Sequence, residues 1–180
     1  GNLICVNPEK QIKIIYKTMN KLISFILTLF ITMGLSAQNK KTVVAYFSAS
    51  GVTEGVAKRL AKEHNADIYT IEPAQKYTSD DLNWRNNKSR SSVEMKDSKA
   101  RPVLKESKSL AQYDVIYIGY PIWWNLAPRI INTFIEQADM DGKTVIPFAT
   151  SGGSSITQSV SDLKSLYPNI KWQSGMLINR

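Results

Sequence analysis

The amino-acid sequence predicts an α/β fold in which helices cover both faces of a parallel sheet. Short apolar runs alternate with segments of helical periodicity along most of residues 41–178, the pattern of repeated strand–helix units. The run at 43–47 is apolar without interruption, and in the run at 114–120 only Asp114 is charged, which is typical of strands buried on both faces. Loops rich in hydroxyls, glycine or tryptophan follow three of the strands, so these loops should meet at one edge of the sheet.

The first strand, residues 43–47, runs into the loop Ser48–Thr53 and a helix that ends near Asn65. We expect Thr53 to cap this helix, whose N-terminus would offer free backbone N–H groups and a positive dipole to an anion. The loop contains no Lys or Arg, and it matches neither the P-loop string nor the dinucleotide string G-x-G-x-x-G. It is a candidate phosphate site, although an ordinary turn rich in Ser and Gly would have the same composition.

A second strand is expected over 66–72, before the least regular part of the chain, residues 73–112. We expect one short helix and long loops there, and a connection of this length usually covers a site or is mobile. Tyr77 and Trp84 are candidates to cover a bound ligand, or they pack the loop against its own sheet. The only histidine, His64, lies in the last turn of the first helix, where it favours the helix terminus rather than catalysis.

The third strand, 114–120, is followed by residues 121–126 (PIWWNL) and a helix that begins near Pro128. Two adjacent tryptophans in a loop are costly to leave in water. They either cover a flat ligand at the carboxyl end of the strand or fill the core or an interface.

The fourth strand, 144–149, runs into residues 150–155 (TSGGSS), in which two glycines allow close approach of a ligand to the backbone. A plain turn between strand and helix would explain these glycines equally well. The next helix should bury Ile156, Val160, Leu163 and Leu166 before Pro168 ends it. A last strand is expected over 170–178.

The three loops together suit a phosphorylated ligand that carries a large flat ring. Flavin mononucleotide (FMN) fits this description better than a nucleoside triphosphate, because the phosphate-binding Lys and the magnesium carboxylate are missing. The sequence also offers no convincing catalytic acid, base or nucleophile. The only cysteine, Cys5, lies near the N-terminus, so no metal site or disulfide is expected in the domain.

At this point the sequence resembles the flavodoxin family. The resemblance covers residues 41–180 and lies in the strings YFSASGVTEGVA, SRSSVEMKD followed by RP, YDVIYIGYPIWWNLAPRIINTF and GKTVIPFATSGGSSI. It implies a three-layer fold with a five-stranded parallel sheet of order 2-1-3-4-5 and FMN across the ends of strands one, three and four. It also implies one more helix after the fifth strand, so we expect the sequence to be truncated.

The resemblance further implies which residues hold FMN. The first loop would hold the phosphate through Ser48, Ser50, Gly51, Val52 and Thr53. The second loop would flank the isoalloxazine with Pro121, Ile122, Trp123, Trp124 and Asn125. The third loop would line the other edge of the isoalloxazine with Thr150, Ser151, Gly152 and Gly153. Three residues depart from the family pattern. Val52 replaces a frequent Asn, Glu54 places a carboxylate beside the phosphate, and Asn125 stands where Gly or Tyr is frequent.

The N-terminal segment predicts export. Residues 1–18 precede Met19 and are expected to be an upstream leader, while 19–37 form a signal peptide with a cut after Ala37, which leaves a domain of residues 38–180. The expected location is the bacterial periplasm, without a stable membrane span after cleavage. An uncleaved signal anchor that tethers the domain is the alternative, because Leu35 is bulky for its position before the cut.

The expected function is that of an exported, FMN-binding redox protein that either carries electrons or acts as a small oxidoreductase. NAD(P)H or a protein would be the donor, and no second nucleotide motif distinguishes these two. The alternative is a non-redox binding module that has lost FMN while keeping the scaffold. Of the 23 basic and 15 acidic residues, 19 and 14 remain after Ala37, a net charge of +5. They are scattered rather than gathered in a stripe, so nucleic acid is not an expected partner.

Overall fold

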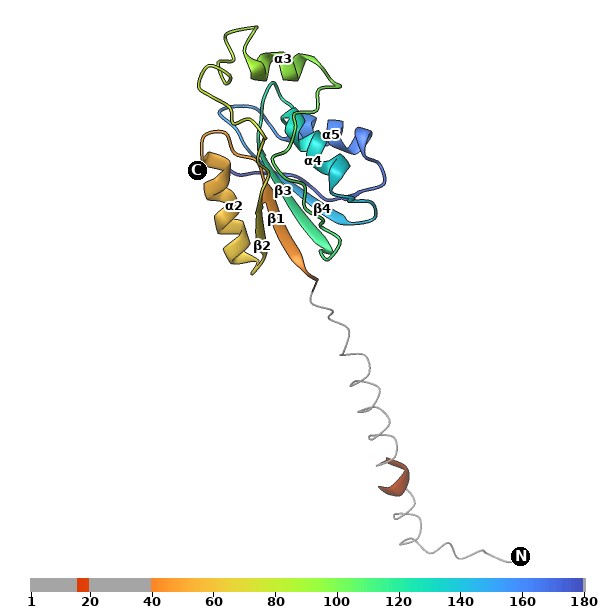
Figure 1. Cartoon of the computed structure of the whole chain (residues 1–180). Coiled ribbons are helices and arrows are strands. Elements are labelled where there is room, and N and C mark those ends of the chain that lie inside the picture. The colour runs from red at the N-terminus through yellow and green to blue at the C-terminus, as the bar shows by residue number, and fades with distance from the viewer. Residues whose placement is uncertain (1–15, 20–39, 180) are drawn as a thin grey trace, which may run out of the picture. The chain divides into compact units, whose positions relative to one another are not determined.

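The computed structural model describes residues 16–19 and 40–179 (Figure 1). The first piece is a single helical turn, and the second forms an α/β domain. The predicted upstream leader and signal peptide therefore lie outside the described residues, apart from residues 16–19. Within the described residues, no helix has the length and apolar character needed to cross a membrane.

The sheet has the predicted order, with strands β2-β1-β3-β4-β5 all pairing in parallel. A short sixth strand also pairs with β4 in parallel. The bounds are β1 (Thr42–Tyr46), β2 (Asp67–Thr70), β3 (Val115–Pro121), β4 (Thr144–Thr150), β5 (Lys171–Trp172) and β6 (Met176–Leu177).

The prediction of one continuous strand over 170–178 was wrong. Both β5 and β6 pair with β4, and the three residues between them lie opposite only two residues of β4, with the Gln173 N–H still donating to the Val145 carbonyl at 2.8 Å. At Gly175 an added Cβ would lie only 2.8 Å from a Val160 methyl group on the neighbouring helix. The chain at Gly175 therefore passes too close to this helix for a side chain.

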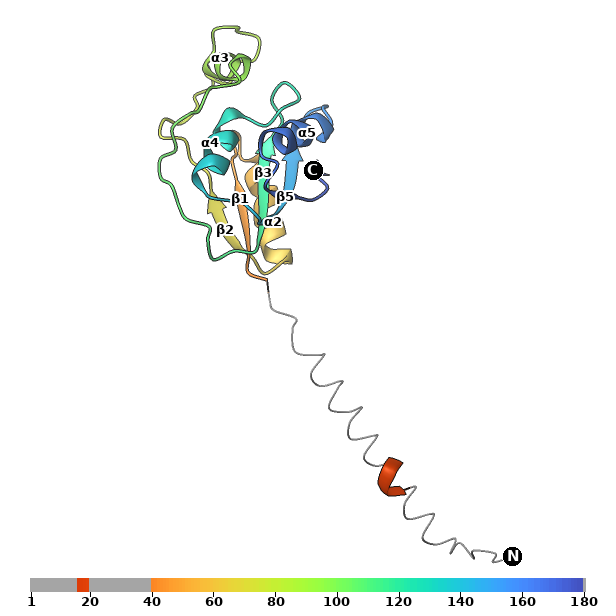
Figure 2. The same ribbon diagram turned by 90° about the vertical axis from the view of Figure 1, so that its right-hand side faces the viewer.

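Four helices complete the domain. They are α2 (Val52–Glu63), α3 (Arg90–Lys96), α4 (Arg129–Gln137) and α5 (Thr157–Leu166). Helix α2 lies on one face of the sheet and α4 and α5 lie on the other, while α3 stands apart from the sheet (Figures 1 and 2). The predicted three-layer architecture is thus confirmed, and the single short helix expected within 73–112 is α3.

Two separate apolar clusters fill the space between the layers. On the α2 side, Val44 and Tyr46 pack with Val56 and Leu60, and on the other side a larger cluster includes residues of α4. Because β1 and β3 contribute to both clusters, their uninterrupted apolar sequence reflects burial on both faces. The apolar face predicted for α5 is shorter than expected, since Leu163 is fully buried whereas Leu166 is 48% exposed.

Helix α2 begins differently from the prediction. Its N-cap is Gly51, with a left-handed φ of 84°, and no side chain caps it. Thr53 is buried, and its hydroxyl forms a hydrogen bond of 2.8 Å with the Thr150 hydroxyl. The expectation that Thr53 caps the helix was therefore wrong, because this hydroxyl links two strand-end loops instead.

Gly119, in β3, permits a very close contact with the neighbouring strand. A Cβ at this position would lie 2.0 Å from Cζ of Phe148, a fully buried ring on β4. The ring thus lies directly over the backbone of the neighbouring strand. This close contact helps to hold together β3 and β4, the two strands whose ends carry the tryptophan and glycine loops.

We expect Gly119→Ala to lower the free energy of unfolding by about 2 kcal/mol or more, because the added methyl group forces the buried Phe148 ring to move. Urea denaturation measures this change. The matched control is Gly55→Ala in α2, where an added Cβ meets nothing within 4 Å. This substitution should stabilise the protein by about 0.5–1 kcal/mol, because alanine favours the helix more than glycine does. Equal effects of the two substitutions would contradict this account of the sheet.

Candidate functional site

The ends of β1, β3 and β4 surround one cavity of about 440 Å³. The Thr53–Thr150 hydrogen bond joins the first and third loops, and the backbone N–H of Ile122 donates to the Thr150 carbonyl at 2.9 Å. Residues of all three predicted loops line the cavity: Ser50, Val52, Pro121, Ile122, Trp123, Thr150, Ser151 and Gly152, together with Asn179. The structure therefore places eight of the fourteen predicted site residues around a common space.

The other six predicted residues lie around this cavity without lining it. Ser48 borders a separate cavity on the β2 side, and Trp124 borders one beside the tryptophan loop. Gly51 shapes the backbone of the first loop, and the buried Thr53 supports it. The last two, Asn125 and Gly153, belong to turns that shape the second and third loops.

The first loop presents an anion-binding helix terminus. The N–H of Gly51 donates to the Ser48 hydroxyl at 3.0 Å, which closes the loop. In the described part of the chain, the backbone N–H groups of Val52, Thr53 and Glu54 have no protein acceptor. These three donors lie at the positive end of the α2 dipole, an arrangement that suits a phosphate group.

Glu54 is the one charged side chain in the first turn of α2. Its carboxylate pairs with Lys58, one turn further along the same helix, at 2.5 Å. The hydrogen bond from Lys58 to Glu54 raises the pKa of the lysine. Because the carboxylate is paired, it opposes a bound anion less than the sequence alone suggested.

The second loop is a tight hairpin that presents both tryptophans. Trp123 and Leu126 exchange two backbone hydrogen bonds of 3.0 and 2.9 Å, and the residues between them, Trp124 and Asn125, have φ values of 46° and 64°. Two successive residues with positive φ define a type I′ turn, which normally takes Asn and Gly. Asn125 tolerates this conformation, whereas Trp124 is strained there and still 46% exposed. Backbone strain at an exposed aromatic residue indicates a functional position.

Trp123 is held in place by two other aromatic rings. Its ring meets Phe47 edge-on at 5.7 Å and Tyr77 edge-on at 5.4 Å between centroids. Phe47 directly follows β1, and Tyr77 comes from the long connection 73–112. Tyr77 thus packs against the aromatic residues of the site, and the second tryptophan remains free to contact a ligand.

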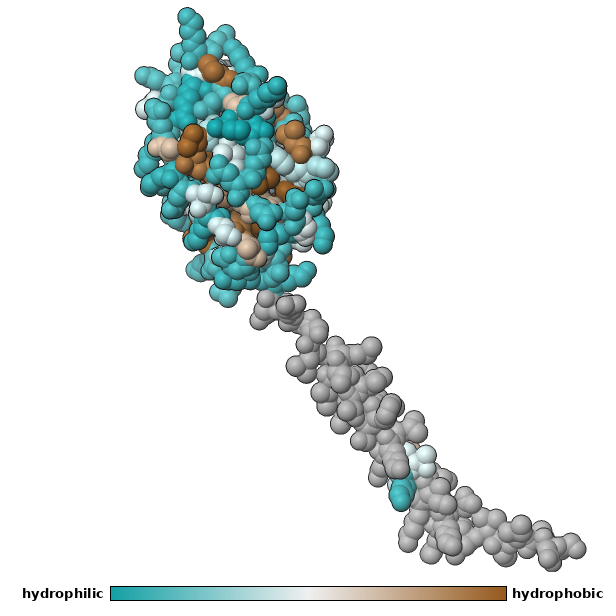
Figure 3. All heavy atoms as spheres, turned by 45° about the vertical axis from the view of Figure 1, so that its right-hand side comes forward, coloured by the Kyte–Doolittle hydropathy of each residue, from teal (hydrophilic) through white to brown (hydrophobic). Residues whose placement is uncertain are grey.

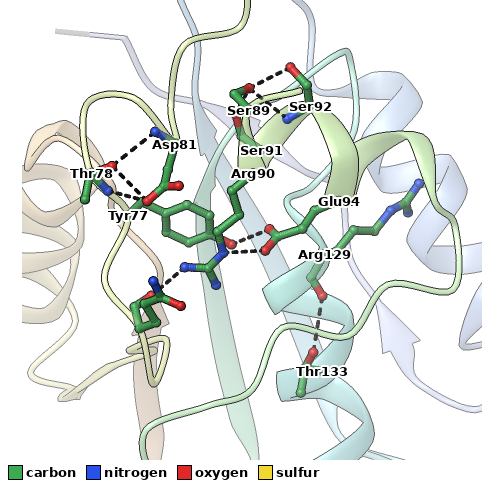
Figure 4. A network of polar contacts seen from close by, with 11 residues as sticks. Tyr77, Thr78, Asp81, Ser89, Arg90, Ser91, Ser92, Glu94, Arg129 and Thr133 are labelled. Carbon is green, nitrogen blue, oxygen red and sulfur yellow. Dashed lines mark hydrogen bonds and ion pairs between the residues drawn. The ribbon is translucent and has the colours of Figure 1, made fainter. Parts of the chain in front are cut away.

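A polar network fixes Tyr77 to α3 (Figure 4). The Tyr77 hydroxyl donates to Glu94 at 2.5 Å, Arg90 pairs with the other oxygen of the same carboxylate at 2.7 Å, and the Arg90 guanidinium lies 4.0 Å from the Tyr77 ring centroid. Burial, and then the hydrogen bond to Glu94, raise the pKa of Tyr77 far above its usual value. The phenol therefore stays neutral, keeps its proton and donates it in the hydrogen bond to the Glu94 carboxylate.

The third loop is held by its own serine and by a residue that the sequence analysis missed. The Ser151 hydroxyl accepts hydrogen bonds from the N–H groups of Gly153 and Ser154, and the Ser151 N–H donates to the side chain of Asn179 at 3.1 Å. Asn179 reaches this loop because β6 pairs with β4 just before it. The sequence would have placed Asn179 beside the third loop only if β6 had been recognised as a separate strand. Among residues 16–19 and 40–179, no cluster of three or more His, Cys, Asp or Glu residues could hold a metal ion.

An α/β domain with strand order 2-1-3-4-5 and its binding loops at the ends of strands one, three and four defines the flavodoxin-like class. The chain matches the flavodoxin family over residues 41–180 and belongs to that family.

Solved structures of similar proteins agree with this assignment. A candidate flavoprotein from Bacteroides uniformis ATCC 8492 is 60% identical, with a TM-score of 0.77 over 78% of this chain and 90% of that one. Another, from Bacteroides eggerthii DSM 20697, is 58% identical, with the same TM-score over 78% and 89%. A flavoprotein from Lactobacillus acidophilus NCFM, solved in complex with FMN, shares the fold at 22% identity, with a TM-score of 0.63 over 77% and 92%. No curated protein gave a match.

We expect Trp124→Gly to change the free energy of unfolding by less than about 1 kcal/mol. Relief of the left-handed strain, worth about 1–2 kcal/mol, offsets the entropy cost of glycine and the loss of a half-exposed ring. Trp123→Ala is the comparison, and it should cost about 2 kcal/mol or more because it removes a ring packed between Phe47 and Tyr77. Urea denaturation of the two variants tests this difference. Equal losses would show that Trp124 serves the fold rather than a ligand.

Proposed function

We propose that this protein binds FMN and works as a redox protein, either as an electron carrier or as a small oxidoreductase. Membership in the flavodoxin family supports FMN as the cofactor, and a flavoprotein of the same fold was solved with FMN bound. The observation that carries the proposal is the meeting of a cation-free helix N-terminus with an aromatic loop at one cavity. A phosphate joined to a flat ring system needs both features side by side.

The residues that would hold FMN follow from the geometry of the loops. The N–H groups of Val52, Thr53 and Glu54, with the nearby Ser50 hydroxyl, would take the phosphate. The isoalloxazine would lie in the 440 Å³ cavity, against Ile122 and Trp123. Each free N–H that meets a phosphate oxygen forms a charge-assisted hydrogen bond, and three such bonds replace the missing Lys or Arg.

The cavity surrounds the proposed ring site with uncharged groups. None of the described residues that line it is an acid, a base or a histidine. When bound, FMN supplies the one- and two-electron chemistry, and the side chains of this chain bind the ring, orient it and exclude water. The donor would be NAD(P)H or a protein.

We expect FMN to bind at least about 100-fold more tightly than riboflavin. Two or three charge-assisted hydrogen bonds to the phosphate, each worth about 1.5–3 kcal/mol, are lost with riboflavin. Titrations that follow flavin fluorescence measure both dissociation constants. Trp123→Ala should weaken the binding of FMN and of riboflavin by a similar factor of roughly ten, because stacking acts on the ring that both flavins share. Equal affinity of the wild-type protein for both flavins would show that the first loop does not bind the phosphate.

We further propose that the protein acts outside the cytoplasm, in the bacterial periplasm, after cleavage behind Ala37. The support is the order of a basic start, the apolar residues 22–35 and small residues at the cut. The full chain, expressed in a bacterium, should yield a soluble periplasmic form whose N-terminal sequencing begins at Gln38. Ala37→Leu is the control, because a bulky residue at the cut should block processing. Wild-type protein that stays whole and membrane-bound would favour the signal anchor instead.

A further inference from the structure

A second cavity of about 360 Å³ lies beside the tryptophan loop. It is lined by Ala49, Ser50, Leu82, Trp84, Ser91, Pro121, Ile122, Trp123 and Trp124. Four of these residues, Ser50, Pro121, Ile122 and Trp123, also line the proposed flavin cavity. The second cavity therefore shares a wall with the first, but its outer side comes from the connection 73–112. Its volume lies within the range of small-molecule sites, ~300–1,000 Å³.

The lining of this second cavity defines what it can bind. None of the nine residues is charged, and three of them are tryptophans. Large aromatic side chains favour flat aromatic ligands, by stacking and by exclusion of water. An uncharged planar ring compound therefore matches this wall better than a sugar, a peptide or a charged metabolite.

Trp84 is the part of this wall that the fold itself does not need. Its side chain is 65% exposed, and its only ring contact among the described residues is with the guanidinium of the adjacent Arg85, 5.0 Å from the ring centroid. An exposed tryptophan at the rim of an apolar cavity is poorly hydrated. On the face of the domain that Figure 3 shows, apolar residues lie in small separate patches on a mostly hydrophilic surface.

The segment that carries Trp84 is fixed on both sides. Before it, the Asp81 carboxylate accepts hydrogen bonds from the N–H and the hydroxyl of Thr78, both at 2.9 Å. After it, the N–H of Ser91 donates to the Asp81 carbonyl at 3.0 Å and so joins the start of α3 to this turn. The outer wall of the cavity is thus preformed.

Ser91 adds one polar group to the apolar wall. It is 2% exposed, and the only hydrogen bond that its hydroxyl forms within the described residues is with the Ser89 hydroxyl, at 3.5 Å. The Ser89 hydroxyl in turn donates to Ser92 at 2.9 Å (Figure 4). The Ser91 hydroxyl can therefore donate to a ligand at little cost. A carbonyl oxygen on a planar ring would accept this hydrogen bond.

We propose that this cavity binds an uncharged planar aromatic compound with ring carbonyl groups, of the quinone class, as a second ligand beside the flavin site. Trp84 and Trp124 hold its ring, and Ser91 donates to one of its carbonyl oxygens. The binding follows from the cavity alone. The role of this compound as an electron acceptor rests on the proposed function, because that role needs FMN in the neighbouring cavity.

The test uses menadione, an uncharged naphthoquinone, and equilibrium dialysis of the purified protein with and without FMN. We expect menadione to bind both forms. Trp84→Ala should weaken menadione binding at least about tenfold, whereas Trp84→Phe should keep most of the wild-type affinity, because phenylalanine also stacks on the ring. Ser91→Ala should weaken it by about 2–10-fold, the effect of one neutral hydrogen bond. Val103→Ala changes an exposed apolar residue that lines neither cavity and should leave binding unchanged.

The affinity for FMN, measured on the same variants, separates the two proposals. Trp84→Ala should leave FMN binding within about twofold of wild type. Competition between FMN and menadione, or a loss of FMN affinity in Trp84→Ala, would assign the second cavity to the flavin and overturn the inference. The inference also fails if neither form binds menadione, or if Trp84→Ala binds it as wild type does. Menadione binding to a protein that never binds FMN would support the cavity and overturn the proposed function alone.

Discussion

The parallel pairing of β1, β3 and β4 is the constraint on which the site depends. Tyr46 pairs with Gly119 and Pro121 pairs with Thr150, so the three strands end almost level with one another. Parallel strands present their carboxyl ends on one edge, and burial on both faces fixes the register because a slip of one residue would exchange the side chains of the two faces. The three loops therefore meet without any need for direct attraction between them.

Recognition of a phosphate without a cation is the chemical consequence of this geometry. The left-handed Gly51 and the Ser48 hydroxyl shape the loop, and the start of α2 then offers its unpaired N–H groups. Such neutral donors act over short distances, whereas Lys and Arg attract anions over a Debye length. Binding at this loop should therefore depend on fit more than on ionic strength. The strained turn at Trp124 serves the same purpose, because it keeps an aromatic ring exposed beside the loop.

Much of the fold and the site could be predicted from the sequence, since each depended on local patterns. Uninterrupted apolar runs marked β1 and β3, and the hydroxyls, tryptophans and glycines that follow the strands marked the loops. The errors came from contacts between distant residues. Thr53 pairs with Thr150 instead of capping its helix, the last strand is interrupted where Gly175 meets α5, and Asn179 reaches the site through β6. Periodicity and spacing carry no information about such contacts.

The connection 73–112 shows why a long irregular segment need not be mobile. Arg90 reaches back to the Gln75 carbonyl at 2.7 Å, Tyr77 donates to Glu94, and the buried Arg129 at the start of α4 donates to the Met95 carbonyl at 3.4 Å. Among the described residues, no acid pairs with Arg129 and its Nε has no partner, so the carbonyl end of α3 is its main compensation. Movement of α3 away from the sheet would leave the buried Arg129 guanidinium without this carbonyl and would break the Tyr77–Glu94 hydrogen bond, although the Arg90–Glu94 pair lies within α3 and would stay intact. These contacts favour a fixed α3, and ligands would then enter through the open sides of the cavities rather than under a moving lid.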